Sequence, residues 1–100
     1  MPKILEIGRY VIYFWSNESG EPIHIHIGTK RPQANDTKMW MSSNGDTSLV
    51  HNKSGIPKKE LKKIQEVIKE NASLVISEWI KRFGTITFHS KLEDEDTEEG

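Results

Sequence analysis

The hydrophobic period changes once along the chain, and this change limits the fold more than any other sequence feature. Before Pro57 the apolar residues form short β-prone runs, and residues 23–27 alternate strictly between isoleucine and histidine, which is typical of a strand. After Pro57 the apolar residues recur at steps of three and four, which indicates an amphipathic helix. Strands followed by a helix predict an α+β fold, in which an antiparallel sheet carries helical structure on one face.

Four to five strands are expected because turn-forming residues separate five β-prone runs. The runs span residues 4–7, 10–15, 23–27, 37–41 and, as a short fifth strand, 47–51. Gly8 stands between the first two runs, as in a hairpin, and Asn44-Gly45 marks a tight turn before the fifth. Residues 85–89 alternate again, so they either add an edge strand or begin the C-terminal tail.

One helical stripe follows, and residues typical of helix ends stand on both sides of it. Pro57 suits a first helical position, and Gly84 suits the residue after the end. Asn71 lies midway, so we expect one long amphipathic helix that is kinked or divided into two parts there. The expected core combines this stripe with inward strand residues. Its members are Ile4, Ile7, Val11, Tyr13, Trp15, Ile23, Ile25, Ile27, Trp40, Leu61, Ile64, Ile68, Val75, Trp79 and Phe83.

Size and charge divide the chain into one domain and a tail. A length of 100 residues with 34% hydrophobic residues suits a single core, and we place one α+β domain at residues 1–90. Residues 91–100 hold one lysine and six acidic residues, a formal charge of −5, which leaves 13 basic and 9 acidic residues, or +4, on the domain. Such a block of like charge predicts a disordered acidic tail.

Several classes of protein are excluded by composition and motif. The chain has no cysteine, so a disulfide framework, a thiolate zinc site and a thiol nucleophile are absent. The longest apolar run, residues 10–15, is far below the roughly 18 residues of a membrane span. The chain start lacks the apolar region of a secretory signal, which points to the cytoplasm. A Gly-x-Ser-x-Gly elbow and a Gly-x-x-x-x-Gly-Lys phosphate loop are also missing.

His24 and His26 are the pair with the greatest chemical potential. Residues i and i+2 of a strand share a face, so with Glu18 they form a candidate functional surface. A metal would need a third ligand, and candidates by residue type are Glu18, Asp36, His51 and His89. The simplest interpretation places both imidazoles on the open face of the sheet, bonded to the loop at residues 16–21. On that interpretation no metal or other cofactor is bound, and alanine at either position leaves the fold intact. A partner-contact surface, a zinc site and an acid–base pair with Glu18 remain alternatives.

Three lysines, Lys58, Lys62 and Lys69, follow one flank of the predicted helix. They form a candidate surface for an anion, a nucleic acid or an acidic partner. Glutamates are interleaved with them, among them Glu60, Glu66, Glu70 and Glu78. An ordinary solvated helix face needs the same mixture of charges, so both interpretations stand.

The order of several short motifs resembles a small bacterial family called domain of unknown function 4160. The motifs that carry this resemblance are Met1-Pro2-x-Ile4, Phe14-Trp15-Ser16-Asn17-Glu18, Glu21-Pro22-Ile23-His24-Ile25-His26-Ile27, Thr37-Lys38-Met39-Trp40, Glu70-Asn71, Trp79 and Phe83-Gly84. The segment from Ser-Asn-Glu to Pro-x-His-x-His is the most specific. Many members of the family have a histidine and a second proline where this chain has Ser19 and Ile23.

The resemblance implies a small cytoplasmic interacting protein of a bacterium, often encoded beside another small protein in a toxin–antitoxin-like arrangement, and it supplies no catalytic residues. We therefore expect an interaction or regulatory module that acts through a protein partner and not on a membrane. Two alternatives are a small enzyme that uses His24 and His26, with zinc as its least expected cofactor, and a weak nucleic-acid-binding module that uses the helix lysines. The oligomeric state is open.

Overall fold

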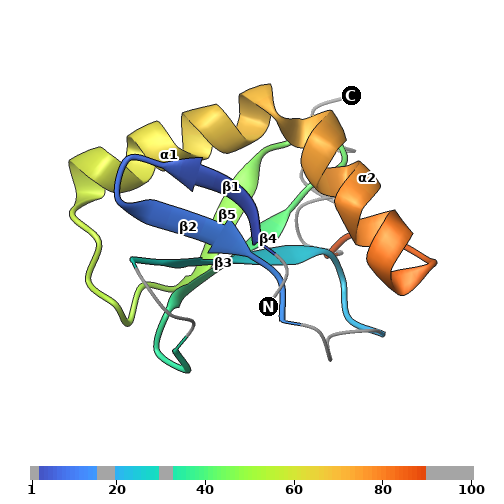
Figure 1. The fold of residues 1–100 in the computed structure, drawn as a ribbon, viewed down its shortest axis with the longest axis horizontal. Helices are drawn as coiled ribbons and strands as arrows, with labels where there is room; N and C mark the ends of the chain where they lie inside the picture. Colours follow the sequence, from blue (N-terminus) through green and yellow to red (C-terminus); the bar gives the residue numbers. More distant parts are fainter. Residues whose placement is uncertain (1–2, 16–19, 30–32, 90–100) are drawn as a thin grey trace.

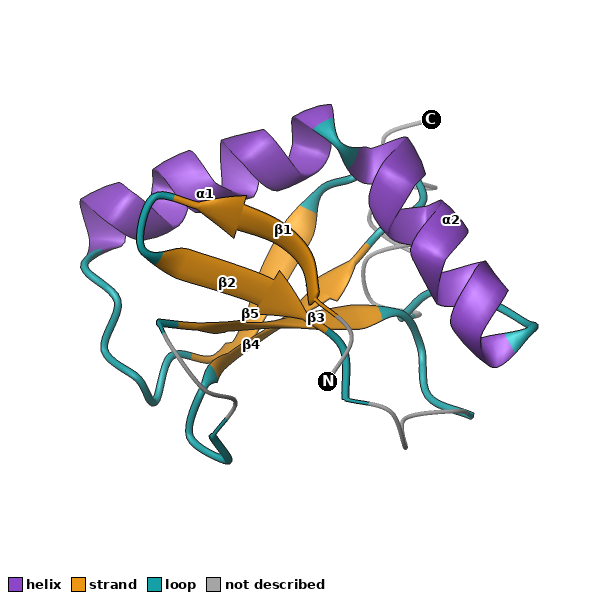
Figure 2. Cartoon of the chain, viewed as in Figure 1, coloured by secondary structure: helices purple, strands orange, loops and turns teal. Residues whose placement is uncertain are grey.

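A computed structural model describes residues 3–15, 20–29 and 33–89, which form a five-stranded antiparallel sheet with two helices on one face (Figure 1). The strands are β1 (Lys3–Ile7), β2 (Tyr10–Tyr13), β3 (His24–Gly28), β4 (Thr37–Met41) and β5 (Thr47–His51). Each strand pairs with the next along the chain, in the order β1-β2-β3-β4-β5. The helices are α1 (Lys58–Glu70) and α2 (Ala72–Phe83) (Figure 2). The predicted α+β class, the fifth strand and the two-part helix are confirmed.

The core lies between the helices and one face of the sheet. The predicted core residues in β3, just before it and in the helix stripe are buried there: Ile23, Ile25, Ile27, Leu61, Ile64, Ile68, Val75 and Trp79. The predicted Ile4, Ile7 and Phe83 pack against this core while partly exposed. The register explains which residues join them, because side chains opposite each other in an antiparallel pair share a face. Ile12 lies opposite Ile27, and Met39 lies opposite Ile25.

The predicted core face of β2 is wrong, as is the assignment of Trp40. Tyr10, Ile12 and Phe14 face the helices, and the core also includes Met39, Met41 and Ile56. Val11, Tyr13, Trp15 and Trp40 belong to the opposite side of the sheet, where Tyr13 is buried and the other three are partly buried. The reason is that every residue from 10 to 15 is apolar, so alternation carried no information about the face of β2.

The helix breaks at Asn71, where the turn between β4 and β5 packs against it. The Asn71 backbone has φ −110° and ψ 23°, and its side-chain amide donates to the Val67 carbonyl oxygen over 2.8 Å. Gly45 in the turn has a φ of 92°, and a Cβ there would lie 2.7 Å from the Cβ of Ala72. Glycine therefore lets the turn and the junction of the two helices approach closely.

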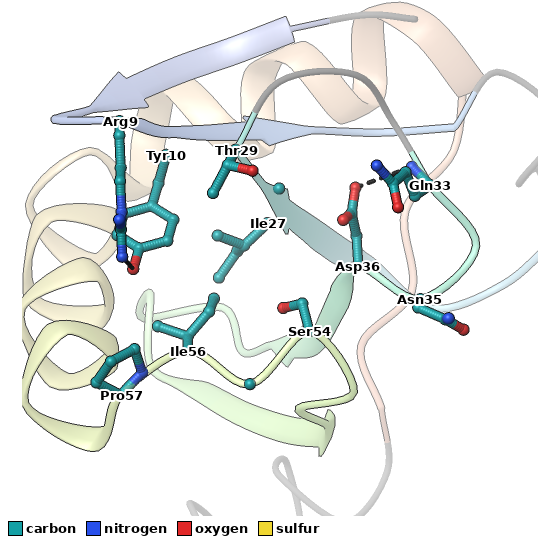
Figure 3. Close-up of a pocket in the computed structure, with 12 residues that line it drawn as sticks. Arg9, Tyr10, Ile27, Thr29, Gln33, Asn35, Asp36, Ser54, Ile56 and Pro57 are labelled. Carbon is teal, nitrogen blue, oxygen red and sulfur yellow. Dashed lines mark hydrogen bonds between the residues drawn. The ribbon is translucent and has the colours of Figure 1, made fainter.

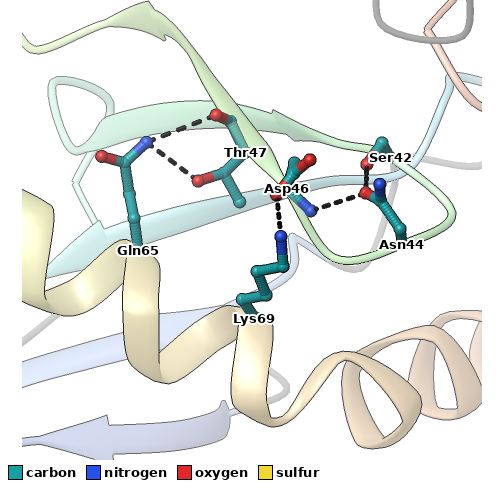
Figure 4. A network of polar contacts seen from close by, with 6 residues as sticks. All are labelled: Ser42, Asn44, Asp46, Thr47, Gln65 and Lys69. Atoms are coloured by element: carbon teal, nitrogen blue, oxygen red, sulfur yellow. Dashed lines mark hydrogen bonds and ion pairs between the residues drawn. The ribbon is translucent and has the colours of Figure 1, made fainter. Parts of the chain in front are cut away.

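The turn is also tied to α1 by polar contacts (Figure 4). Lys69 Nζ lies 2.6 Å from Asp46 Oδ1, and Gln65 Nε2 donates to Thr47 Oγ1 over 2.9 Å. These contacts hold the β5 end of the sheet to the helix that crosses it.

After α2, residues 84–89 run back to the sheet without forming a strand in the described part of the chain. The Ile23 amide donates to the Thr87 carbonyl oxygen over 2.9 Å, Ile86 and Phe88 pack on the core, and His89 reaches Trp40. The predicted acidic tail, residues 91–100, lies outside the described residues. None of the helices in the described ranges is long and apolar enough to cross a membrane.

Candidate functional site

The sheet face that points away from the helices carries a group of rings, which we call the aromatic layer. Strand pairing assembles it, because Tyr13 of β2 lies opposite His26 of β3, and His24 lies opposite Trp40 of β4. Ring centroids within the layer are 4.6–6.2 Å apart. Its members are Tyr13, Trp15, His24, His26, Trp40 and His89.

His24 is fully buried in this layer. Its Nδ1 lies 2.8 Å from the Pro22 carbonyl oxygen, and because a carbonyl oxygen only accepts, Nδ1 carries the hydrogen. Trp40 contacts the ring edge-on at 5.6 Å, and Trp79 reaches it from α2 at 5.4 Å. The tautomer and the orientation of His24 are therefore set by its surroundings.

His26 is 7% exposed and stacks on Tyr13, with ring centroids 5.4 Å apart. The Tyr13 hydroxyl in turn donates to Asp36 Oδ2 over 2.6 Å. Stacking on an aromatic ring and edge contacts with neighbouring rings stabilise a buried imidazole in the same way as they stabilise other aromatic pairs. His26 is thus part of the aromatic layer, and Tyr13 connects it to the buried carboxyl group of Asp36.

The interpretation that both imidazoles lie on an open face is wrong, because the layer packs over them. Trp15 covers His26 edge-on at 6.2 Å. His89, which arrives after α2, stacks on Trp40 at 4.6 Å and closes the layer beside His24. Most of the loop at residues 16–21, to which a bond was predicted, lies outside the described residues, because residues 16–19 are not described, and the predicted role of Glu18 lies there too.

Of the candidate third metal ligands, the three that the structure describes, Asp36, His51 and His89, do not assemble with His24 and His26 into a metal site. Asp36 accepts from Tyr13, and His89 stacks on Trp40. Burial, and after it the charges of Lys53 and Lys38, lower the pKa of His51. Within residues 3–15, 20–29 and 33–89, no three histidine, aspartate or glutamate side chains are placed to hold a metal ion.

Zinc is expected to leave the melting temperature of the protein unchanged. A tetrahedral zinc site needs at least three protein ligands, and in the described ranges no third histidine, aspartate or glutamate is placed to complete a site with His24 and His26. Thermal unfolding of untagged protein with equimolar zinc, and with chelator as the control, measures this. A rise of several degrees that His26→Gln abolishes would contradict the expectation, because only a ligand of the native state stabilises it.

The helix lysines are exposed, but they do not form a purely basic surface. Lys69 pairs with Asp46, as described for the turn. Lys62 and Lys69 border a shallow hollow with Glu66 between them, and Lys58 stands at the start of α1. Acidic and basic side chains are therefore mixed along this flank, as on an ordinary solvated helix face.

A polar pocket near Asp36 was not predicted from the sequence. Arg9, Gly28, Asp36 and Ser54 contribute to its lining, and the sequence predicts Asp36 only as a candidate third metal ligand by residue type. The sequence feature that comes closest to marking this pocket is a glycine at the end of β3 followed by a polar loop. This pattern occurs in many structures, so it does not predict a pocket.

The fold and the site define a small α+β domain in which a meander sheet carries two helices on one face and a His-x-His pair in an aromatic layer on the other. A family model described as Domain of unknown function (DUF4160) matches residues 10–80, and the chain belongs to this family. A search of curated proteins and a search of solved structures gave no match. Since the family description names no activity, the function has to be argued from the structure.

Proposed function

We propose that this protein is an interaction module that binds a protein partner through the outer face of α2. The observation that carries the proposal is a shallow groove of about 570 Å³ along this face. Two serines, two isoleucines and one lysine at helical spacing line it, namely Ser73, Ile76, Ser77, Ile80 and Lys81. Ile80 is 42% exposed, which is a large exposure for an isoleucine in a protein that has so few apolar residues to spare.

The shape of this groove favours an amphipathic helix as the partner element. Serines at 73 and 77 are one turn apart, and Ile76 and Ile80 follow at the same spacing, so a ridge of a second helix can pack between them. Lys81 is exposed at the groove and favours an acidic side chain on the partner helix.

The edge of β5 is a less suitable contact surface. Leu49 and Val50 are exposed there, but the register of β4 and β5 shifts between Lys38 and Met39 and leaves Val50 without an opposite residue. A bulge of this kind twists an edge strand and opposes the addition of another strand.

The enzyme and nucleic-acid alternatives have less support. His24 and His26 are packed among aromatic rings, where a substrate cannot reach them without opening the layer, and Lys69 is paired with Asp46. The family resemblance implies a two-gene, toxin–antitoxin-like arrangement in a bacterial cytoplasm. The product of the neighbouring gene would be a protein partner of the proposed kind.

Co-expression with the product of each neighbouring gene tests the proposal. We expect one of these products to copurify with the chain, and the double variant Ile80→Glu, Lys81→Glu to reduce the recovered partner by about tenfold or more, since it removes an apolar anchor and reverses a charge. Leu49→Glu is the matched control, because Leu49 is 43% exposed on β5, and it should leave recovery unchanged.

Three results would contradict the proposal. Equal loss in the double variant and in Leu49→Glu would remove the α2 groove as the contact surface, and the absence of any copurifying neighbour would remove the protein partner. The third result is self-association, which light scattering of the chain alone would detect. If the chain forms a dimer that Ile80→Glu dissociates, a second copy of the chain occupies the groove.

A further inference from the structure

A second concave site is separate from the α2 groove and shares no lining residue with it. Here β2, the end of β3 and the segment before α1 enclose a pocket of about 280 Å³ (Figure 3). Ile27 and Ile56 form an apolar floor, while Arg9 and Asp36 stand on opposite sides. Small-molecule sites are concave and place a few polar groups where they fix the orientation of the ligand, and here most of the lining is polar.

Asp36 supplies the strongest polar group of the pocket. It is 7% exposed, and its Oδ2 accepts hydrogen bonds from the Tyr13 hydroxyl over 2.6 Å and from the Gln33 amide over 3.0 Å. Both donors use the same oxygen, so Oδ1 retains its capacity to accept from a ligand. Figure 3 shows the carboxyl group directed to the inside of the pocket.

Gly28 lets this carboxyl group reach its place. A Cβ on Gly28 would lie 2.8 Å from Asp36 Cγ, a separation that real Cβ atoms essentially never show. Because the nearest atoms belong to the buried Asp36 side chain, a methyl group there has to displace the carboxyl group.

Ser54 presents a second acceptor, and its hydrogen-bond direction follows from its neighbours. Thr37 Oγ1 donates its one hydrogen to Asn52 Oδ1 over 2.6 Å, so in the 2.6 Å contact of Thr37 with Ser54 the serine is the donor. The Asn52 amide cannot be reversed, because its Nδ2 donates to the Ile56 carbonyl oxygen and its Oδ1 accepts from the Ile56 amide. Ser54 therefore offers only lone pairs to a ligand.

From these contacts we propose that the pocket binds the guanidinium group of a small ligand, with Asp36 Oδ1 and Ser54 Oγ as acceptors. A guanidinium has several N–H donors in one plane and matches two separate acceptors, one of them charged, better than a single-donor group does. The apolar floor of Ile27 and Ile56 suits the methylene stem that carries such a group.

Arg9 adds a preference for a ligand with a negative charge at its other end. Its guanidinium donates to the Tyr10 hydroxyl over 3.1 Å and lies 3.5 Å from Glu60 Oε1. Because arginine has five N–H donors, others stay available to a carboxylate. Free arginine, with a guanidinium and a carboxylate, has the chemistry that these two sides of the pocket require.

Titration of the full-length chain with L-arginine, followed by amide chemical shifts in NMR, tests this site. We expect saturable shifts centred on residues 27–29, 33–36 and 54–56. L-Citrulline is the matched ligand control, because it has the same shape with a neutral urea group, and it should bind at least about tenfold more weakly since the charged hydrogen bonds are lost. Equal affinities for the two ligands, or arginine shifts elsewhere, would overturn the proposal.

Three variants test the named groups. Asp36→Asn and Ser54→Ala should each weaken arginine binding, and Gly28→Ala should do so by displacing the carboxyl group. Asp46→Asn, which changes an aspartate of the β4–β5 turn, is the control and should bind as the original chain does. If Asp36→Asn does not fold, Ser54→Ala and the citrulline comparison still decide the outcome, and unchanged affinity in Ser54→Ala would overturn the role of that acceptor.

Two further ligands identify the source of the guanidinium. Agmatine lacks the carboxylate, so it should bind more weakly than arginine, and Arg9→Gln should remove that difference. An acetylated Gly-Arg-Gly amide presents the same group as a protein side chain. Tighter binding of this peptide would assign the pocket to an arginine of a protein, and tighter binding of arginine would assign it to the free amino acid.

Discussion

Trp79→Ala is expected to lower the free energy of unfolding by about 3–5 kcal/mol. Trp79 is 1% exposed in α2 and packs against three other rings: Phe83 at 4.3 Å, Phe14 at 5.0 Å and His24 at 5.4 Å. Alanine loses these contacts and leaves a cavity that the sheet and the helix cannot both close. Since small domains are stable by only about 5–15 kcal/mol, this variant should be close to unfolding at 37 °C.

Urea denaturation followed by circular dichroism measures this effect. Lys63→Ala is the control, because Lys63 lies on the exposed side of α1 and its removal should change stability by less than about 0.5 kcal/mol. Equal denaturation midpoints for the two variants would contradict the arrangement in which the apolar stripe of both helices covers the sheet.

Local sequence patterns predicted the elements of this fold but not all of its faces. In β3 alternation alone assigned Ile25 to the core, and in the helices the steps of three and four assigned Ile64 and Ile68 correctly. In β2 every residue is apolar, so its inward face depends on the register with β3, where Ile12 lies opposite Ile27. Register is a long-range property, and the periodicity of one strand does not contain it.

The two histidines show the same limit at the candidate site. Alternation correctly placed His24 and His26 on one face, away from the isoleucines. That this face is covered follows from long-range contacts, because Trp79 of α2 packs on His24, and His89 reaches Trp40 only after both helices. Local patterns could not predict the pocket either, because its contacts join residues far apart in the sequence. Tyr13 and Asp36 are 23 positions apart, and Thr37 and Ser54 are 17 apart.

Because His24 is buried in the aromatic layer, its replacement is expected to lower the stability of the fold. On an open sheet face the same replacement would have been neutral. His24→Ala is now expected to destabilise the fold by about 2–4 kcal/mol, a cost between those of a buried aliphatic and a buried aromatic side chain. Two effects combine: a cavity opens between Trp40 and Trp79, and the Pro22 carbonyl oxygen loses the hydrogen bond from Nδ1.

Urea unfolding followed by tryptophan fluorescence suits this variant, because two of the rings around His24 are indoles. His51→Ala is the control: His51 is partly exposed on the edge strand β5, and its loss should cost less than about 1 kcal/mol. His24→Phe separates the two effects, since its slightly larger ring leaves no cavity and removes the donor, so its stability should fall between those of the original chain and His24→Ala. A His24→Ala protein as stable as the His51→Ala control would show that the aromatic layer does not hold His24, and the open-face interpretation of the His-x-His pair would then be restored.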